Sequence, residues 1–305
     1  MEQTNPAASA PVISMPSFFS LVGESFEMYG RKWKSLFKII FASFGFIALA
    51  VVTGVLLAVV FGTVSAANIG VAIAIGIIAA IAAIIGCIYV SVWFGAAIIV
   101  VLTDNQDNIG FGAAMKRARP YINSYFEVSI LSGLIALLGF VLFFIPGIIF
   151  SIWYMFSRYL VFTDNEKGIM AISKSREYAR GYFGKIFLLS LLGGILMFVW
   201  EMMANVIPFV GPIINVLLIT PMSLIYSYLI FSHLRKIKGP AINIISTDNQ
   251  NLTKILAGLG TIVLLLGIGL VIAFAPQIKS YYETELPKYQ SQSGSQLPPI
   301  PQRPI

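Results

Sequence analysis

The chain has 305 residues, of which 58% are hydrophobic and only 11% are charged. A soluble domain carries about 25% charged residues, so this composition excludes a water-facing globule. One histidine and one cysteine leave little material for metal cages, histidine-dependent catalysis or a disulfide framework. The net charge of +7 is explained by juxtamembrane basic residues and needs no nucleic-acid partner. We therefore expect a membrane protein without a cofactor.

Seven apolar runs are long enough to be membrane helices, since about 20 apolar residues cross the hydrocarbon core. The runs are Ser35 to Gly62, Ile69 to Leu102, Tyr125 to Phe144, Gly147 to Phe162, Lys185 to Val206, Phe209 to Phe231 and Ile255 to Ala275. The first exceeds the apolar core of a cleavable signal peptide and is expected to be retained. The second exceeds one crossing, so it tilts, kinks, protrudes or breaks into two helices. The sequence predicts an all-α polytopic transmembrane helix bundle.

Three blocks with helical amphipathic spacing precede pairs of these runs. They are Phe19 to Trp33, Phe111 to Tyr125 and Ile169 to Phe183. Their apolar residues recur every three or four positions, which is typical of helices that lie in a membrane interface. Pro120 is expected to bend the second helix. The pattern predicts a diverged threefold repeat of one interfacial helix and one hairpin.

The chain divides into four parts on this basis. Residues 1–15 are expected to be disordered, and 16–239 form a polytopic domain of three hairpin units. Residues 240–275 form a linker and the seventh helix, and 276–305 form a polar, proline-rich tail. The tail favours an extended spacer, although a partner could bind its polyproline end.

Basic residues cluster at every second connection, whereas the segments Gly62 to Gly70, Phe144 to Gly147 and Ile207 to Pro212 contain none. The positive-inside bias assigns the basic side to the cytoplasm. We predict a multi-pass protein of the cell membrane with a cytoplasmic N-terminus and an external C-terminal tail.

Eight basic residues in or beside the amphipathic blocks are expected to bind lipid headgroups, because each cation near an anionic membrane gains about 1 kcal/mol. They are Arg31, Lys32, Lys116, Arg117, Arg119, Lys174, Arg176 and Arg180. Membrane lipids, with anionic headgroups favoured, are the expected partners, and no protein partner is identified.

Five small residues recur at every fourth position of the second run. They are Ala79, Ala83, Cys87, Ser91 and Gly95. Small residues allow helices to approach closely in lipid, so this stripe predicts a helix-packing face, with Cys87 as a small apolar member.

Thr-Asp-Asn occurs three times, starting at Thr103, Thr163 and Thr247, and each time Gln or Glu follows. The pattern matches the capping box at a helix start; an ion-binding role for the carboxylates is the alternative. Within the sixth run, Pro221 is expected to kink the helix, as a static bend or as a gate.

The segment Pro146-Gly147-Ile148-Ile149, followed by Tyr159, Asp164, Ala171-Ile172, Lys174-Ser175 and Gly181-Tyr182-Phe183, resembles the membrane domain of glycerophosphoryl diester phosphodiesterases. That family includes uncharacterised bacterial polytopic membrane proteins. The likeness is best over Pro146 to Phe187. The family's enzymes carry a soluble metal-dependent barrel after the membrane part. We expect none here, because a seventh run and a short tail follow and one histidine cannot supply a catalytic pair. The resemblance thus implies a stand-alone membrane module.

These features predict an integral membrane protein that is not an enzyme and acts in membrane organisation or by binding lipids or a partner. Repeated hairpins and Pro221 leave a transporter of a small amphiphilic solute as the alternative. A lipid-modifying enzyme is a third reading, and it would require a catalytic pair such as Asp164 with Arg158.

Overall fold

The computed structural model describes residues 14–64, 69–206, 210–239 and 247–284, and these ranges contain helices but no strand. Seven helical stretches in them are long and apolar enough to cross a membrane, one at each predicted run. The chain is therefore an all-α, polytopic integral membrane protein, as the sequence predicts. Most of the predicted disordered segment 1–15 and of the proline-rich tail lies outside the described residues.

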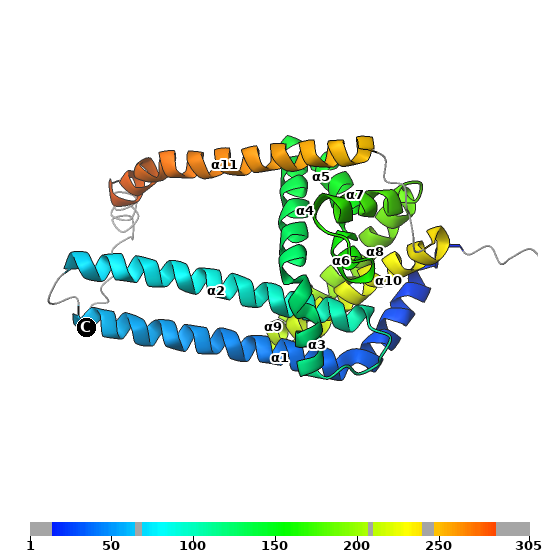
Figure 1. The fold of residues 1–305 in the computed structure, drawn as a ribbon, viewed down its shortest axis with the longest axis horizontal. Coiled ribbons are helices and arrows are strands. Elements are labelled where there is room, and N and C mark those ends of the chain that lie inside the picture. The colour runs from blue at the N-terminus through cyan, green and yellow to red at the C-terminus, as the bar shows by residue number, and fades with distance from the viewer. Residues whose placement is uncertain (1–13, 65–68, 207–209, 240–246, 285–305) are drawn as a thin grey trace, which may run out of the picture.

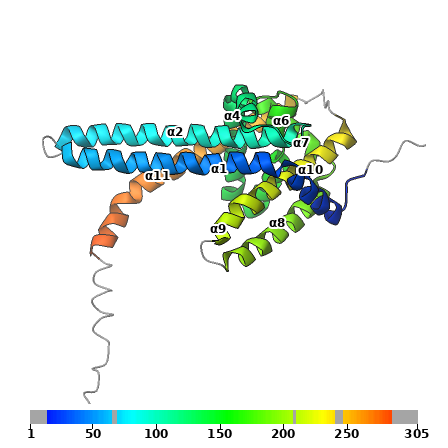
Figure 2. The ribbon, with the colours of Figure 1, turned by 90° about the horizontal axis from the view of Figure 1, so that it is seen from below.

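The first hairpin consists of α1 (Phe18–Val64) and α2 (Ile69–Thr103), which lie side by side and project from the rest of the molecule (Figures 1 and 2). The sequence predicts a separate surface helix before the first span, but α1 is one continuous helix whose first turns are set at an angle to the remainder (Figure 1). The predicted second run is likewise one helix and does not break. At the other end of this arm, Met15 is buried and its carbonyl accepts a hydrogen bond from Lys185 (3.1 Å), although the sequence assigns it to the disordered segment.

The small-residue stripe on α2 is partly exposed. Ala83, Cys87 and Ser91 are exposed, whereas Gly95 meets α4, where the Tyr125 hydroxyl lies 3.0 Å from the position of an added Cβ. The reason is that this part of α2 lies outside the molecular body, beside α1 alone (Figure 2). The packing role of the stripe as a whole stays a prediction.

The second hairpin follows α3 (Phe111–Ala118) and the 3₁₀ turn η1 (Arg119–Tyr121), which contains Pro120 and confirms the predicted bend. Its helices are α4 (Ile122–Leu142) and α5 (Phe144–Tyr154). Gly139 and Gly147 make the turn tight, because a Cβ on Gly139 would lie 2.7 Å from the Gly147 Cα. The predicted fourth run does not stay one helix: α5 ends at Tyr154 and α6 (Ser157–Thr163) continues it.

The third amphipathic block forms α7 (Gly168–Ala179), which is mostly buried rather than lying in an interface. It contacts α4, α5, α6, α10 and α11. Ser175 shows why a polar helix can pack here. Its hydroxyl donates to the Trp153 carbonyl (2.8 Å) and accepts from the Phe156 amide (3.2 Å), so it satisfies the backbone at the α5–α6 break. Burial of α7 corrects the prediction of a surface helix over Ile169 to Phe183.

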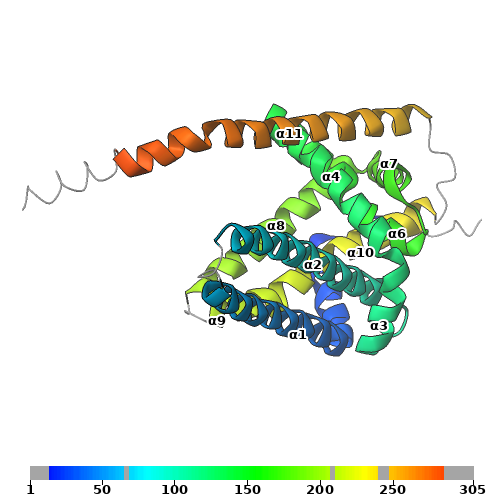
Figure 3. The ribbon, with the colours of Figure 1, turned by 60° about the vertical axis from the view of Figure 1, so that its left-hand side comes forward.

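The third hairpin pairs α8 (Phe183–Asn205) with α9 (Val210–Ile214), a π-helical turn η2 (Asn215–Ile219) and α10 (Thr220–Lys238). Gly193 lets the two sides approach, since a Cβ there would lie 2.5 Å from the Tyr226 ring. The last helix, α11 (Thr247–Thr284), crosses α4 steeply (Figures 1 and 3). At this crossing Gly260 lies against the backbone of Leu134.

Candidate functional site

The main concentration of buried charge surrounds Asp164, in the loop between α6 and α7. Its carboxylate pairs with Lys174 (2.6 Å) and with Arg235 of α10 (2.8 Å), and Lys174 also reaches Glu166 (3.2 Å). The side chains of Asp164 and Lys174 are only 5% and 7% exposed. We call these four residues the Asp164 cluster. It joins two hairpins through a salt bridge that lies almost entirely out of water.

Local backbone geometry brings the cluster together. Asn165 has φ +55° and Gly168 has φ +49°, so the chain leaves α6 and enters α7 through left-handed residues that reverse its direction. This short loop places Asp164 and Glu166 beside the second turn of α7, where Lys174 lies. Burial by itself lowers the pKa of Lys174, but hydrogen bonds and charge attraction from Asp164 and Glu166 outweigh burial and raise that pKa above 10.5.

A second aspartate, Asp104, holds the corresponding loop between α2 and α3. It pairs with Arg117, while the Lys32 ammonium donates to the carbonyls of Val101 (2.8 Å), Asp104 (2.7 Å) and Gln106 (3.1 Å). A cation on the last carbonyls of α2 also complements the negative end of the helix dipole. We call Asp104, Arg117 and Lys32 the Asp104 cluster.

The two clusters share one design. In each, a threonine ends a helix, an aspartate follows it, and the aspartate pairs with the seventh residue of the next helix, Arg117 in α3 or Lys174 in α7. This similarity is what two copies of one unit would show, and the threefold repeat stays a prediction. It also corrects the capping-box prediction at Thr103 and Thr163, which end α2 and α6. Only Thr247 begins a helix, α11.

The third Thr-Asp-Asn docks α11 onto α7. Asn249 is buried; its amide donates to the Ser173 carbonyl (3.1 Å) and to Glu177 (2.8 Å), and its oxygen accepts from Arg176 (3.0 Å). Arg176 also lies over the ring of Trp153, 4.5 Å from its centroid. The polar residues of this repeat motif therefore stabilise helix contacts.

The C-terminal end of α10 connects the remaining elements. His233 contacts Glu24 of α1 (2.8 Å), and Lys238 donates to the carbonyls of Glu177 and Arg180 (both 2.6 Å) at the end of α7. His233 thus ties α10 to α1.

Pro221 lies at the start of α10, directly after the π-helical turn η2, and its effect on the helix hydrogen bonds is compensated by α1. A proline has no N–H for the carbonyl four residues earlier, which here belongs to Leu217 in the π-helical turn η2. The Tyr29 hydroxyl donates to that carbonyl (2.9 Å). The hydrogen bond that Pro221 cannot form is therefore replaced by one from another helix.

We expect Tyr29→Phe to lower the free energy of unfolding by about 1 kcal/mol, because the Leu217 carbonyl then lacks this donor. Pro221→Ala restores a backbone N–H, so Tyr29→Phe should cost less in that background. Unfolding of the wild type, both single variants and the double variant in mixed micelles measures the coupling. Equal losses in the two backgrounds would refute the compensation.

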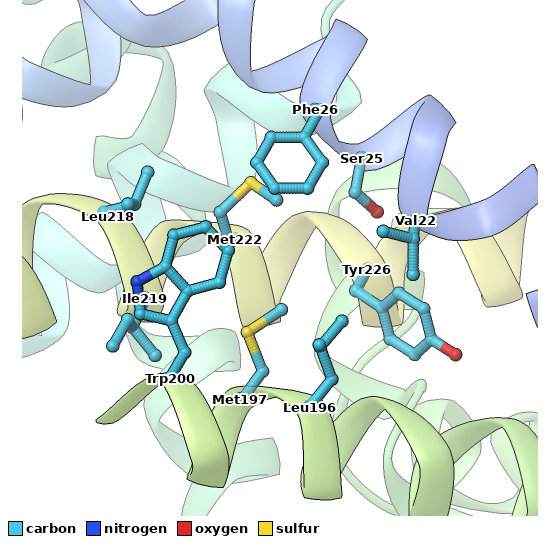
Figure 4. Close-up of a pocket in the computed structure, with 10 residues that line it drawn as sticks. All are labelled: Val22, Ser25, Phe26, Leu196, Met197, Trp200, Leu218, Ile219, Met222 and Tyr226. Carbon is cyan, nitrogen blue, oxygen red and sulfur yellow. The ribbon is translucent and has the colours of Figure 1, made fainter. Parts of the chain in front are cut away.

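A crevice between α1, α8 and α10 lies beside Pro221, with Ile219 and Met222 in its lining. Figure 4 shows Phe26, Trp200, Met197 and Met222 turned toward the same space. The Phe26 and Trp200 rings are 6.0 Å apart. The free volume is about 10 Å³, roughly what one water molecule needs, and the only hydroxyls in the lining, Ser25 and Tyr226, donate to the carbonyls of Leu21 and Leu189. This conformation therefore leaves no room for a solute in the crevice.

The eight predicted headgroup residues fall into two groups. Lys32 and Lys174 are buried, and protein oxygens surround their ammonium groups. Their position differs from the predicted headgroup role, because burial of α7 and of the end of α2 keeps these two lysines away from the surface. The others keep exposed or half-exposed side chains. Four of these have protein partners: Arg31 with Glu27, Arg117 with Asp104, Arg176 with Asn249 and Arg180 with Glu177. Lys116 and Arg119 are exposed, and no acidic partner contacts them within the described ranges.

Several exposed cations were not in that predicted set. Lys34 and Lys38 lie one helical turn apart on α1 and are exposed, beside an aromatic ladder formed by Trp33, Phe37 and Phe41. Consecutive ring centroids in the ladder are 6.4 and 5.9 Å apart. In the sequence, the i, i+4 spacing of the two lysines and of the three aromatic residues is the pattern that could have identified this surface.

The catalytic pair required by the third reading is not formed. Asp164 contacts Lys174 and Arg235, whereas Arg158 is exposed on α6 and makes no ion pair in the described part of the chain. Among the same residues, no three His, Cys, Asp or Glu side chains are grouped closely enough to hold a metal ion. Comparisons with protein families, with curated proteins and with solved structures find no match to this chain.

Proposed function

We propose that this integral membrane protein acts by binding acidic membrane lipids at its basic residues, as a non-catalytic organiser of the membrane around it. The observation that carries the proposal is the division of its cations. Buried lysines are saturated by protein oxygens, whereas Lys34, Lys38, Lys116 and Arg119 point outward without acidic partners in the described chain. Unpaired cations beside aromatic side chains are typical of the headgroup region.

The aromatic ladder supports the same reading. Trp33, Phe37 and Phe41 are 45%, 42% and 66% exposed, and such amphipathic and apolar rings are favoured at the membrane interface. Lys34 and Lys38 have long apolar stems that can lie along the same surface while their ammonium groups reach phosphates. The stretch of α1 from Trp33 to Phe41 therefore offers both an apolar and a charged contact to lipid.

We also propose the orientation. The basic end of α10, Lys254 near the start of α11 and the exposed cations of α1 and α3 belong on the cytoplasmic side, which puts the N-terminus inside and the tail outside. The resemblance to the phosphodiesterase membrane domain supports a membrane module of this kind.

Reconstituted vesicles test the binding function. Spin-labelled phosphatidylglycerol should associate with the wild type more strongly than spin-labelled phosphatidylcholine does. Neutralising Lys34→Gln and Lys38→Gln together should lower this preference by up to about fivefold for each lost cation, which corresponds to about 1 kcal/mol each.

The double substitution Lys34→Arg and Lys38→Arg is the matched control, because it keeps both charges and should keep the preference. A wild type without any preference for phosphatidylglycerol, or a preference unaffected by the Gln substitutions, would overturn the proposed function.

A further inference from the structure

A groove between α2 and α4 combines an apolar floor with unpaired positive charge at one end. Four residues of α2 and three of α4 line its volume of about 220 Å³. They are Ile85, Ile88, Tyr89, Val92, Ile122, Asn123 and Phe126. Six of these side chains contribute apolar surface to the groove. Its polar groups are the Asn123 amide and the Tyr89 hydroxyl. The groove suits an alkyl chain whose polar end lies near Asn123.

The charge lies on the turn that leads into α4. Arg119 precedes Asn123 by four residues and Phe126 by seven. The three residues therefore share one face of the helical segment formed by η1 and the start of α4. Lys116 lies one turn earlier in α3. Both cations are exposed and have no acidic partner in the described ranges, in contrast to Arg117, which Asp104 neutralises. An anion bound at this end of the groove would neutralise the positive charge of Lys116 and Arg119.

The walls of the groove are held in place at the charged end. The Trp93 indole on α2 donates to the Met115 carbonyl of α3 (3.0 Å), and Gly95 of α2 lets Tyr125 of α4 come within contact distance. Figures 1 and 3 show α3 at the junction of the two helices. The spacing between Arg119 and the apolar floor is therefore built into the fold, so that a ligand carrying both features binds without rearrangement.

We propose that this groove is a binding site for one acidic glycerophospholipid, with an acyl chain along Ile85, Ile88 and Phe126 and the phosphate on Arg119, assisted by Lys116. The inference rests on the proposed lipid-binding function and adds a discrete site to it. Uncompensated charge at the end of an apolar groove selects an anionic amphiphile over a zwitterionic lipid.

The test uses the full-length protein in detergent, with bound lipid counted by native mass spectrometry during titration with phosphatidylglycerol or phosphatidylcholine. Arg119→Gln should weaken the first phosphatidylglycerol bound by about fivefold, the equivalent of 1 kcal/mol for one cation, and leave phosphatidylcholine unchanged. Ile88→Trp should fill the groove and weaken both lipids. Inorganic phosphate should not compete at millimolar concentration, because the acyl chain supplies part of the affinity.

Lys254→Gln is the matched control, since Lys254 is an exposed lysine on a different helix, α11, and forms no ion pair within the described ranges. Equal losses for Arg119→Gln and Lys254→Gln, or full competition by phosphate, would overturn the groove site while leaving diffuse lipid binding intact. If the wild type binds phosphatidylglycerol no better than phosphatidylcholine, the proposed function fails together with the site. Thermal unfolding of each variant verifies that it is folded.

Discussion

Lys174→Met should lower the free energy of unfolding by about 3 kcal/mol. Asp164 and Lys174 are 5% and 7% exposed, and removing one partner of a buried pair leaves an uncompensated charge at a cost of 3–5 kcal/mol. The lower end applies here because Arg235 still pairs with Asp164 (2.8 Å). Glu166, in contrast, loses its cation. Unfolding by sodium dodecyl sulfate in mixed micelles measures the change.

Two controls separate this effect from loss of a lysine in general. Lys167→Met removes a neighbouring lysine that is exposed, and it should change stability by no more than about 0.5 kcal/mol. Adding Asp164→Asn to Lys174→Met removes both charges and should restore part of the loss. A Lys174→Met protein as stable as the Lys167→Met protein would contradict a structural role for the Asp164 cluster.

The same pair predicts an alkaline limit. The pKa of Lys174 is raised in the folded protein from its ordinary value of 10.5. For a group with a raised pKa, the stabilisation is complete below the unfolded value and is lost as the pH rises through the folded value. The contribution of the pair should therefore be constant at neutral pH and fall above pH 10.5. Lys174→Arg, whose guanidinium stays charged, should remove this part of the decline.

Apolar run length predicted all seven membrane helices, because the hydrocarbon core imposes the same length requirement wherever a helix lies. It could not predict the fate of the polar segments. Ile169 to Phe183 has the composition of a surface helix, but α7 is buried because α4, α5, α10 and α11 pack around it, and Arg235 of α10 pairs with Asp164 beside Lys174. Pairing across hairpins leaves no mark in a local pattern.

The Thr-Asp-Asn motif failed for a related reason. The capping box is read from residue spacing alone, and it applies only if a helix follows at once. After Thr163, the left-handed conformation of Asn165 prevents a helix from starting. After Thr103, the Asp104 carboxylate accepts a hydrogen bond from the Gln106 amide (2.8 Å) and forms a turn. The exposed Ala83 and Cys87 illustrate a different limit: small residues permit close packing, but they do not specify which helix packs there.

Gly260→Leu should destabilise the protein by about 3 kcal/mol by separating α11 from α4. An added Cβ would lie 2.3 Å from the Leu134 carbonyl oxygen and 2.7 Å from its carbon. These are backbone atoms inside a regular helix, so they cannot move aside as a side chain can. If α11 stayed docked, the strain would exceed the 1–3 kcal/mol that overpacking usually costs. We therefore expect the helix to move away and lose its contacts with α4.

Gly258→Leu is the matched control on the same helix, since nothing lies within 4 Å of a Cβ at Gly258. Leucine is a better helix former than glycine by roughly 0.5–1 kcal/mol, so this substitution should stabilise α11 slightly. The two variants add the same side chain two residues apart and should change the free energy of unfolding in opposite directions. If both variants raise the free energy of unfolding, the close crossing of α4 and α11 does not exist in solution. The docking of α11 would then depend on the contacts of Asn249 with α7.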